Sequence, residues 1–403
     1  MSVPATPSGN RAALVLSGGG AAGAYEVGVM KALFGGKSPA TGFRKLDPEI
    51  LVGTSVGAMN ASFILSCPDP DLLTATRQLE HIYLTEVVSG GVDCKSPIVR
   101  LRASPSAFFN PRCYIPNPFA PFLQMAGDAA SLATAFVEHS IQFFETPDTV
   151  DHRLIGEADF TALLDTSAFR QLIGRYLDPD RMRATTRNLI LVATNWENGA
   201  PTLFTLDDLT GSSAVDIVVA SAALPIAFPQ AGVKGHPFAD GGIVMNSALA
   251  PALHAGAREM HLVYVDPNVS SLPISRWPGT AETAYRSLVM ALAAMVNHDL
   301  DVAQRINLGL AALNRARQQG SAAVPGEARD ILYMLGAAES NIPADSQFHQ
   351  VTVHRYIPNR APGGAFRWLN FSADNITETI ELGYRDTIEH DCARHQCIIA
   401  NNA

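Results

Sequence analysis

Residues 49–65 read EILVGTSVGAMNASFIL and place a serine between an apolar run and a helix-compatible segment. This pattern predicts a strand, a sharp turn at Ser55 and a helix, which is the setting of a nucleophile elbow. Gly53 and Gly57 flank the serine and would let neighbouring backbone pass close to the bent chain. An ordinary glycine-rich turn with an N-capping serine can have the same sequence pattern. The surrounding sequence therefore has to distinguish a nucleophile elbow from such a turn.

A second glycine cluster lies upstream of this turn. The apolar run Ala12–Leu16 predicts a buried strand, and residues 17–33, SGGGAAGAYEVGVMKAL, predict a loop that opens a helix. Parallel strands joined by a right-handed crossover end at the same edge of a sheet, so we expect this loop beside Ser55. Backbone N–H groups in such a loop can approach a reacting oxygen, which predicts an oxyanion hole. The three loop glycines are Gly18, Gly19 and Gly20.

The same loop also fits a different class of site. Gly18, Gly20 and Gly23 satisfy the G-x-G-x-x-G spacing of a dinucleotide-binding turn. That site needs an acidic residue near the end of the second strand to hold a ribose, but Asp47 and Glu49 come before this strand. The lack of an acidic residue at the end of this strand therefore favours an oxyanion loop and leaves the nucleotide site as the weaker alternative.

The third glycine-containing motif is FADGG at residues 238–242. Asp240 follows a short apolar stretch, and Gly241 and Gly242 would let the chain bend tightly beside a reacting group. An Asp-Gly pair is often only a turn. Because the chain also carries the Ser55 motif, however, this motif predicts a carboxylate that can act as a base.

These motifs, in this order, resemble those of the patatin-like phospholipase family, in particular its bacterial members. Residues 220–229, ASAALPIAFP, and residues 371–387, FSADNITETIELGYRDT, are also similar to stretches of that family. The resemblance covers residues 11–270 well. It implies an α/β fold, a three-layer sandwich with a mostly parallel central sheet.

The resemblance also implies a lipid acyl hydrolase of the phospholipase A or lysophospholipase type that works without cofactor or metal. Ser55 and Asp240 would form a catalytic dyad, cleaving fatty-acyl esters through an acyl-serine intermediate. An acyltransferase or a thioesterase on the same dyad, or a non-catalytic scaffold that binds acyl chains or a protein, are the alternatives. The oxyanion donors would be Gly18, Gly19 and Gly20, and the supporting glycines would be Gly23, Gly53, Gly57, Gly241 and Gly242. Many family members carry Lys or Arg where this chain has Ala22, so preference for an anionic phospholipid is not implied.

A serine–acid–histidine triad is the mechanistic alternative, because α/β-hydrolases carry these groups in that chain order. The candidate histidines, all of which follow Asp240, are His254, His261, His298, His349 and His354. None has a recognisable catalytic setting. His254 lies in an Ala-rich helical stretch and His261 begins the strand-like run HLVYV, so the sequence favours the dyad.

Composition limits the classes of partner. The 403 residues are 47% apolar and 17% charged, which is enough apolar content for one large domain. A net charge of −9 argues against nucleic acid and against broad adhesion to an anionic membrane, so membrane contact would be transient, local and apolar. The absence of a signal-like start or an 18-residue apolar run, and an odd count of five cysteines, predict a cytoplasmic protein.

The predicted domain organisation has a flexible N-terminus at 1–10, a catalytic domain at 11–270 and a C-terminal helical extension at 271–403 packed on it. An inserted loop and lid region is expected at about 86–150, with an apolar helical pattern at 119–146. The extension should hold a long helix from about 281 to 319, which could dimerise, and a late strand at 349–357 that extends the sheet. The oligomeric state is left open, a homodimer included.

Cysteine and histidine residues gather at the C-terminus, where His390, Cys392, His395 and Cys397 offer ligand types that suit zinc. Their spacing matches no common zinc pattern. The stretch from Thr377 to Ile399 reads as one helix, on which these four side chains would not share a face. The sequence therefore predicts a polar terminal helix and no metal site.

Overall fold

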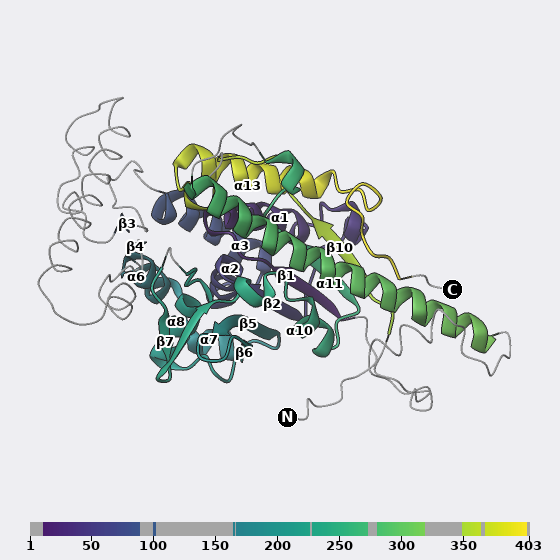
Figure 1. Cartoon of the computed structure of the whole chain (residues 1–403), viewed down its shortest axis with the longest axis horizontal. Coiled ribbons are helices and arrows are strands. Elements are labelled where there is room, and N and C mark those ends of the chain that lie inside the picture. Colours follow the sequence, from purple (N-terminus) through teal and green to yellow (C-terminus); the bar gives the residue numbers. More distant parts are fainter. Residues whose placement is uncertain are drawn as a thin grey trace, which may run out of the picture.

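A computed structural model gives the structure of the chain and describes residues 11–88, 100–101, 164–165, 167–225, 228–272, 280–318, 349–363 and 367–400. Within these ranges, eight strands form a twisted central sheet flanked by helices (Figure 1). The N-terminal tail and the predicted lid at 119–146 lie outside the described residues. No described helix combines the length and the apolarity needed to cross a bilayer.

The central sheet has the strand order β10-β9-β1-β2-β5-β8-β7, and β6 pairs with β5. Neighbours from β10 to β5 are parallel, whereas β6, β7 and β8 run antiparallel to their partners. The strands are β1 (Ala12–Leu16), β2 (Ile50–Thr54), β5 (Asn188–Asn195), β6 (Pro201–Thr205), β7 (Ala231–Val233), β8 (His236–Asp240), β9 (Glu259–Val263) and β10 (Thr352–Tyr356). A separate antiparallel pair joins β3 (Arg100–Leu101) and β4 (Leu164–Asp165).

Helices cover both faces of this sheet. They are α1 (Ala24–Phe34), α2 (Val56–Ser66), α3 (Leu72–Ile82), α6 (Ser167–Tyr176), α7 (Pro179–Arg183), α8 (Gly211–Ser221), α9 (Gly242–Met245), α10 (Leu249–His254), α11 (Thr280–Gln318) and α13 (Ala373–Ile388). Short helical turns are η1 (Gly20–Gly23), η2 (Pro39–Thr41), η3 (Tyr83–Val87), η6 (Val269–Ser271) and η7 (Arg367–Leu369). In Figure 1, α13 and α1 lie together at the top and α11 runs diagonally across the front.

Alternating side chains of the parallel strands divide the core into two layers. Leu14 and Leu16 pack into one apolar cluster with α1, α2, α3, α8 and α13. Ala13 and Val15 pack into the other with α10 and the middle of α11. Because successive side chains of a strand point to opposite faces, the fully apolar run Ala12–Leu16 is what a sheet buried on both faces requires. The predicted three-layer α/β sandwich is confirmed.

The C-terminal part contributes directly to this architecture. The predicted late strand is β10, which pairs in parallel with β9 at the edge of the sheet, and the predicted long helix is α11. Helix α13 crosses α1 at very short range, because a Cβ on Gly28 would lie 2.0 Å from the carbonyl oxygen of Ile380. On the other side, a Cβ on Gly383 would lie 2.1 Å from the carbonyl oxygen of Tyr25. Helix α13 is therefore packed tightly against the helix that follows the glycine loop.

The predicted helix from Thr377 to Ile399 is wrong in its second half, because α13 ends at Ile388. Asp391 accepts hydrogen bonds from the backbone N–H groups of Ala393 and Arg394, at 2.8 and 3.3 Å, and so stabilises a turn. Side chains that bond to nearby backbone in this way compete with helical hydrogen bonding. After the turn, the chain doubles back and Ile398 pairs with β10.

Candidate active site

Ser55 occupies the strained turn between β2 and α2, with φ 56° and ψ −123°. A non-glycine residue in such a conformation costs on the order of 1–3 kcal/mol and persists only where its surroundings hold it. The Ser55 N–H donates to Oγ of Ser221 at 2.9 Å, and that hydroxyl donates to the carbonyl oxygen of Val192 at 2.6 Å. Ser221 thus anchors the elbow to the next strand of the sheet.

Gly53 and Gly57 are required because the elbow packs directly against backbone. A Cβ on Gly53 would lie 2.6 Å from the carbonyl oxygen of Gly57, and a Cβ on Gly57 would lie 2.4 Å from the carbonyl oxygen of Leu16. Both distances are shorter than any side chain can tolerate. Helix α2 can therefore begin over the end of β1 only because these two positions lack side chains.

The predicted glycine loop lies beside Ser55. A Cβ on Gly18 would lie 2.9 Å from Cβ of Ser55. Gly20 has φ +56°, and a Cβ there would lie 2.4 Å from the carbonyl oxygen of Trp368. Gly23 packs on the first turn of α2, since its Cβ would lie 2.3 Å from Cγ2 of Val56. The sheet edge thus brings the two glycine motifs together as the parallel topology predicts.

One of the three predicted oxyanion donors already has a partner. The N–H of Gly18 donates to Oδ1 of Asn246 at 2.9 Å. Asn246 is buried, follows α9 and was not identified from the sequence, where nothing in its neighbourhood separates it from an ordinary loop residue. Of the glycines in the loop, Gly19 and Gly20 are left as the candidate donors to a bound oxygen.

Asp240 ends β8 and lines the same pocket as Ser55, whose side chain is close enough to lower the pKa of the Asp240 carboxyl. The N–H of Gly242 also donates to Oδ1 of Asp240, at 2.7 Å. Asp240 is only 4% exposed. Burial raises its pKa from 3.8 to about 6, although Ser55 and the hydrogen bond from Gly242 act in the opposite direction.

The segment after α8 connects the elbow to this aspartate. The N–H of Asp240 donates to the carbonyl oxygen of Ala223 at 2.9 Å, and that of Gly241 donates to the carbonyl oxygen of Ser221 at 3.1 Å. A Cβ on Gly241 would lie 2.2 Å from the carbonyl oxygen of Val192, so the bend at this position also needs glycine. Ser221 therefore holds both halves of the candidate dyad.

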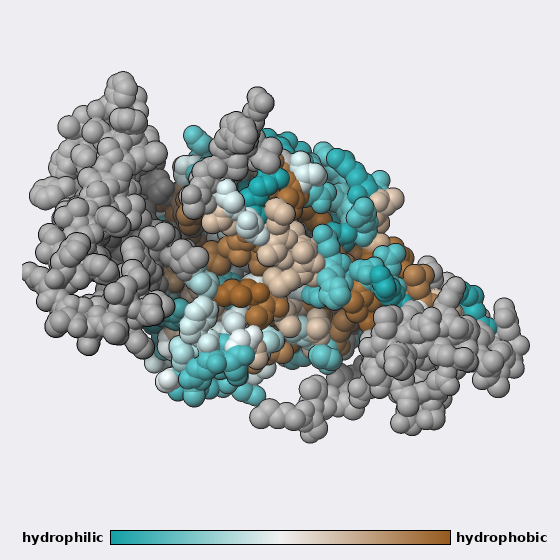
Figure 2. Space-filling view, in the orientation of Figure 1, coloured by the Kyte–Doolittle hydropathy of each residue, from teal (hydrophilic) through white to brown (hydrophobic). Residues whose placement is uncertain are grey.

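A pocket of about 880 Å³, including its open mouth, has Ser55 and Asp240 among its lining residues. Most of the other lining side chains are apolar and come from α2, α6, α11 and the stretch around η7. They include Met59, Val87, Phe169, Leu224, Phe228, Ile243, Leu288, Leu292, Trp368, Leu369 and Phe371. Figure 2 shows apolar residues gathered at the centre of the face that α11 crosses in Figure 1.

The wall beside the glycine loop is fixed by a buried ion pair. Arg367 forms a salt bridge with Asp266, and the indole Nε1 of Trp368 donates to the same carboxylate at 2.9 Å. Arg367 and Ala22 line one small cavity behind the loop. Ala22, where many family members carry Lys or Arg, therefore has a buried arginine nearby. The charge of this arginine is balanced by Asp266.

The histidines proposed for a triad lie elsewhere. Among the described residues that line the pocket there is no histidine. His254 ends α10, and His261 lies on β9 with Nδ1 3.0 Å from the hydroxyl of Tyr356. His354 lies on β10 and joins the C-terminal cysteines. These placements give the triad no support.

The site thus belongs to an α/β protein with a nucleophile elbow and an adjacent buried carboxylate. A model of the patatin-like phospholipase family matches residues 14–253, which is more than half of the chain. The chain therefore belongs to the patatin-like phospholipase family, and this membership supports lipid acyl hydrolysis in general.

The similarity to individual proteins is weaker. Among solved structures, VipD from Legionella pneumophila is similar at 16% sequence identity over 93% of this chain and 67% of that chain, with a TM-score of 0.33. A comparison with curated proteins finds no match.

Proposed function

We propose that this chain is a lipid acyl hydrolase of the phospholipase A or lysophospholipase type in which Ser55 is the nucleophile and Asp240 the base. The observation that carries the proposal is that Ser55 of the strained elbow and the buried Asp240 both line one mostly apolar pocket. An alcohol needs a base to accept its proton before it attacks an ester at neutral pH. Burial makes Asp240 a stronger base than an aspartate in water.

Acylation would begin when the Ser55 hydroxyl transfers its proton to Asp240 and Oγ attacks the ester carbonyl carbon. The oxyanion that forms would accept hydrogen bonds from the N–H groups of Gly19 and Gly20, each worth about 3 kcal/mol in the transition state. Asp240, now protonated, would return the proton to the leaving alcohol as the acyl group remains on Ser55. A water activated by Asp240 would then release the fatty acid and restore the serine.

The pocket favours a fatty-acyl group over a polar one. Leu288 and Leu292 of α11 and Phe371 beyond η7 offer apolar surface, and the polar lining groups are mainly those of the dyad and the glycine loop. Each CH₂ transferred from water to such a surface contributes about 0.8 kcal/mol. The substrate would enter through transient peripheral contact with a lipid surface, and the chemistry would need no metal.

Hydrolysis should accelerate as the acyl chain lengthens within the pocket. For esters of one alcohol with acyl chains of about four, six and eight carbons, we expect kcat/KM to rise up to roughly fourfold per methylene. Initial rates in the presence of a chelator measure this directly. Mass spectrometry of products from mixed phospholipid vesicles then identifies the ester bond cleaved. A flat or falling series would contradict an acyl-binding pocket.

The rate should also depend on the ionisation of Asp240. Only the carboxylate can accept the serine proton, so kcat/KM should increase about tenfold per pH unit below pH 6 and level off above it. Fatty-acid release measured between about pH 4.5 and pH 8.5 by mass spectrometry gives this profile. A midpoint near 4, the ordinary value of an aspartate, would show that burial does not tune this base.

A further inference from the structure

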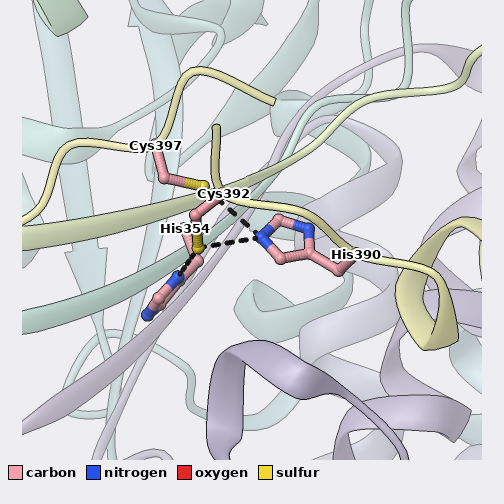
Figure 3. Close-up of side chains that lie close together, drawn as sticks. All are labelled: His354, His390, Cys392 and Cys397. Carbon is pink, nitrogen blue, oxygen red and sulfur yellow. Dashed lines mark hydrogen bonds between the residues drawn. The ribbon is translucent and has the colours of Figure 1, made fainter. Parts of the chain in front are cut away.

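A cluster of thiol and imidazole groups lies where the C-terminal segment folds back over the sheet edge (Figure 3). His354 comes from β10, and His390, Cys392 and Cys397 come from the turn after α13. The two segments are joined by backbone pairing, because the N–H of Val353 donates to the carbonyl oxygen of Ile398 at 2.7 Å and the N–H of Ile398 donates to the carbonyl oxygen of Val353 at 3.0 Å. Four side chains with zinc-ligand atoms therefore converge from two parts of the chain.

The separations between these ligand atoms match those around one tetrahedral ion. Sγ of Cys392 lies 3.4 Å from Nδ1 of His354 and 3.5 Å from Nε2 of His390. Sγ of Cys397 lies 3.4 Å from the same Nε2 of His390. With Zn–S near 2.3 Å and Zn–N near 2.0–2.1 Å, sulfur and nitrogen ligands at the tetrahedral angle are about 3.5 Å apart. All four ligand atoms lie within 4.8 Å of one another, so a small contraction would complete the site.

The surroundings of the cluster supply groups that commonly support metal ligands. The N–H of Arg355 donates to Sγ of Cys397 at 3.4 Å, which suits a thiolate. Nε2 of His354 lies 3.9 Å from Oε1 of Glu259, and this carboxylate oxygen is 3.2 Å from Nε2 of His261. A carboxylate behind a histidine fixes which ring nitrogen faces a metal. Here that nitrogen is Nδ1 of His354.

We propose that Nδ1 of His354, Nε2 of His390 and the sulfurs of Cys392 and Cys397 form a structural zinc site. Zinc suits two thiolates and two imidazoles, and two thiolates balance its charge at a partly buried place. On binding, the two thiols release their protons to solvent and their sulfur lone pairs form the Zn–S bonds. Four protein ligands leave no open position, so the site stabilises structure and is separate from ester hydrolysis.

The proposed ligand set differs from the four C-terminal residues whose types suit zinc, and the sequence alone predicts no metal site. His395 is not a ligand: its ring stacks on His390 at a centroid distance of 4.7 Å, and its Nδ1 lies 2.8 Å from the carbonyl oxygen of Asp391. His354 takes its place from 36 residues upstream of His390. Because α13 ends at Ile388, the three C-terminal ligands are not held apart by helical geometry.

The proposed ion would clamp the C-terminus onto the edge strand of the sheet. None of its four ligands is among the described residues that line the pocket of Ser55. The clamp instead connects β10 to the end of α13, and α13 packs on α1, the helix that follows the glycine loop. Loss of the ion should therefore lower the stability of the fold without removing any group that reacts with the substrate.

Metal analysis of the full-length chain tests the proposal. We expect protein from zinc-supplemented cells, purified under reducing conditions, to contain about one zinc per chain. Cys392→Ser and His354→Gln should each lower this to less than about a tenth when the protein is dialysed against a chelator of moderate affinity. Cys67→Ser and His395→Gln are the matched controls, because Cys67 lies in the core beyond α2 and His395 touches the site without supplying a ligand. Both controls should keep their zinc.

Cobalt gives an independent measurement that does not depend on the variants folding. Co²⁺ added to the metal-free, reduced wild-type chain should produce thiolate-to-cobalt charge transfer and the visible bands of a tetrahedral centre, both abolished by one equivalent of Zn²⁺. Uptake of neither ion while free thiols are measured at both cysteines would overturn the proposal. So would a Cys392–Cys397 disulfide that persists under the reducing conditions, or full zinc content in both ligand variants.

Discussion

Replacing Ser55 by alanine is expected to lower kcat/KM for an acyl ester by at least about 10⁴-fold, because the oxygen proposed to form the acyl intermediate is removed. Alanine keeps the Cβ that already fits the strained turn, and its N–H can still donate to Ser221. The protein should therefore fold, and the residual rate should reflect only binding and the oxyanion loop. Initial rates on a chromogenic ester and on phospholipid vesicles measure the loss.

Ser62 provides the matched control in the same helix. It is buried in α2, and among the described residues its Oγ has no hydrogen-bond partner. Removing an unbonded hydroxyl from a buried site is close to neutral for stability, so Ser62→Ala should keep wild-type activity. If Ser55→Ala retained more than about a hundredth of the wild-type rate with this control intact, Ser55 could not be the nucleophile.

Replacing Asp240 by asparagine is expected to lower kcat by about 10²- to 10⁴-fold, the range for loss of a general base. Asparagine has nearly the same shape and keeps an oxygen for the N–H of Gly242, but it cannot accept the serine proton at neutral pH. Asp216→Asn is the control, since Asp216 lies on α8 and forms a partly exposed salt bridge with Arg170. That change should leave kcat within twofold or so, because such pairs contribute little.

The same substitution separates loss of activity from loss of folding. The pKa of Asp240 is about 6 in the folded chain against an ordinary 3.8. The stability that this group contributes is fully present below about pH 4 and is lost as the pH rises through 6. At pH 8 the buried carboxylate costs up to about 3 kcal/mol, so Asp240→Asn should be at least as stable as wild type there. A variant that is inactive because it unfolds at pH 8 would contradict this account of the base.

Much of the site could be predicted because its signals are local. A strand, a strained serine and a helix follow one another within residues 49–65, and each of Gly53 and Gly57 meets backbone that no side chain could approach. The parallel pairing of β1 with β2 then places the upstream glycine loop beside Ser55. Alternation of apolar side chains on these strands likewise accounts for the predicted layers.

The remaining features depend on contacts between distant parts of the chain. Asn246 accepts from Gly18 across 228 residues, and Trp368 packs over Gly20 from the other end of the sequence. No local pattern marks either residue. The C-terminal cluster shows the same limit, because the predicted helix ends at Ile388, before the turn at Asp391, and the fourth proposed zinc ligand lies on β10.

The C-terminal third has a larger part in the site than a helical extension would have. It supplies the edge strand β10, the pocket residues Trp368 and Phe371, and the buried Arg367 that pairs with Asp266. Breaking a buried ion pair by removing one partner typically costs about 3–5 kcal/mol, so this wall is a fixed part of the pocket. A zinc clamp at its end would hold the same unit in place.

The measurement that tests the central claim most directly is covalent labelling of the intact chain with a long-chain alkyl fluorophosphonate, followed by mass spectrometry of the protein and its peptides. The phosphonyl group takes the place of the acyl carbonyl in the reaction with an activated serine, and fluoride leaves. The account predicts one adduct per chain, located on Ser55, absent in Ser55→Ala and formed much more slowly in Asp240→Asn. Labelling of another residue, or ester hydrolysis that continues in a chain fully labelled at Ser55, would contradict it.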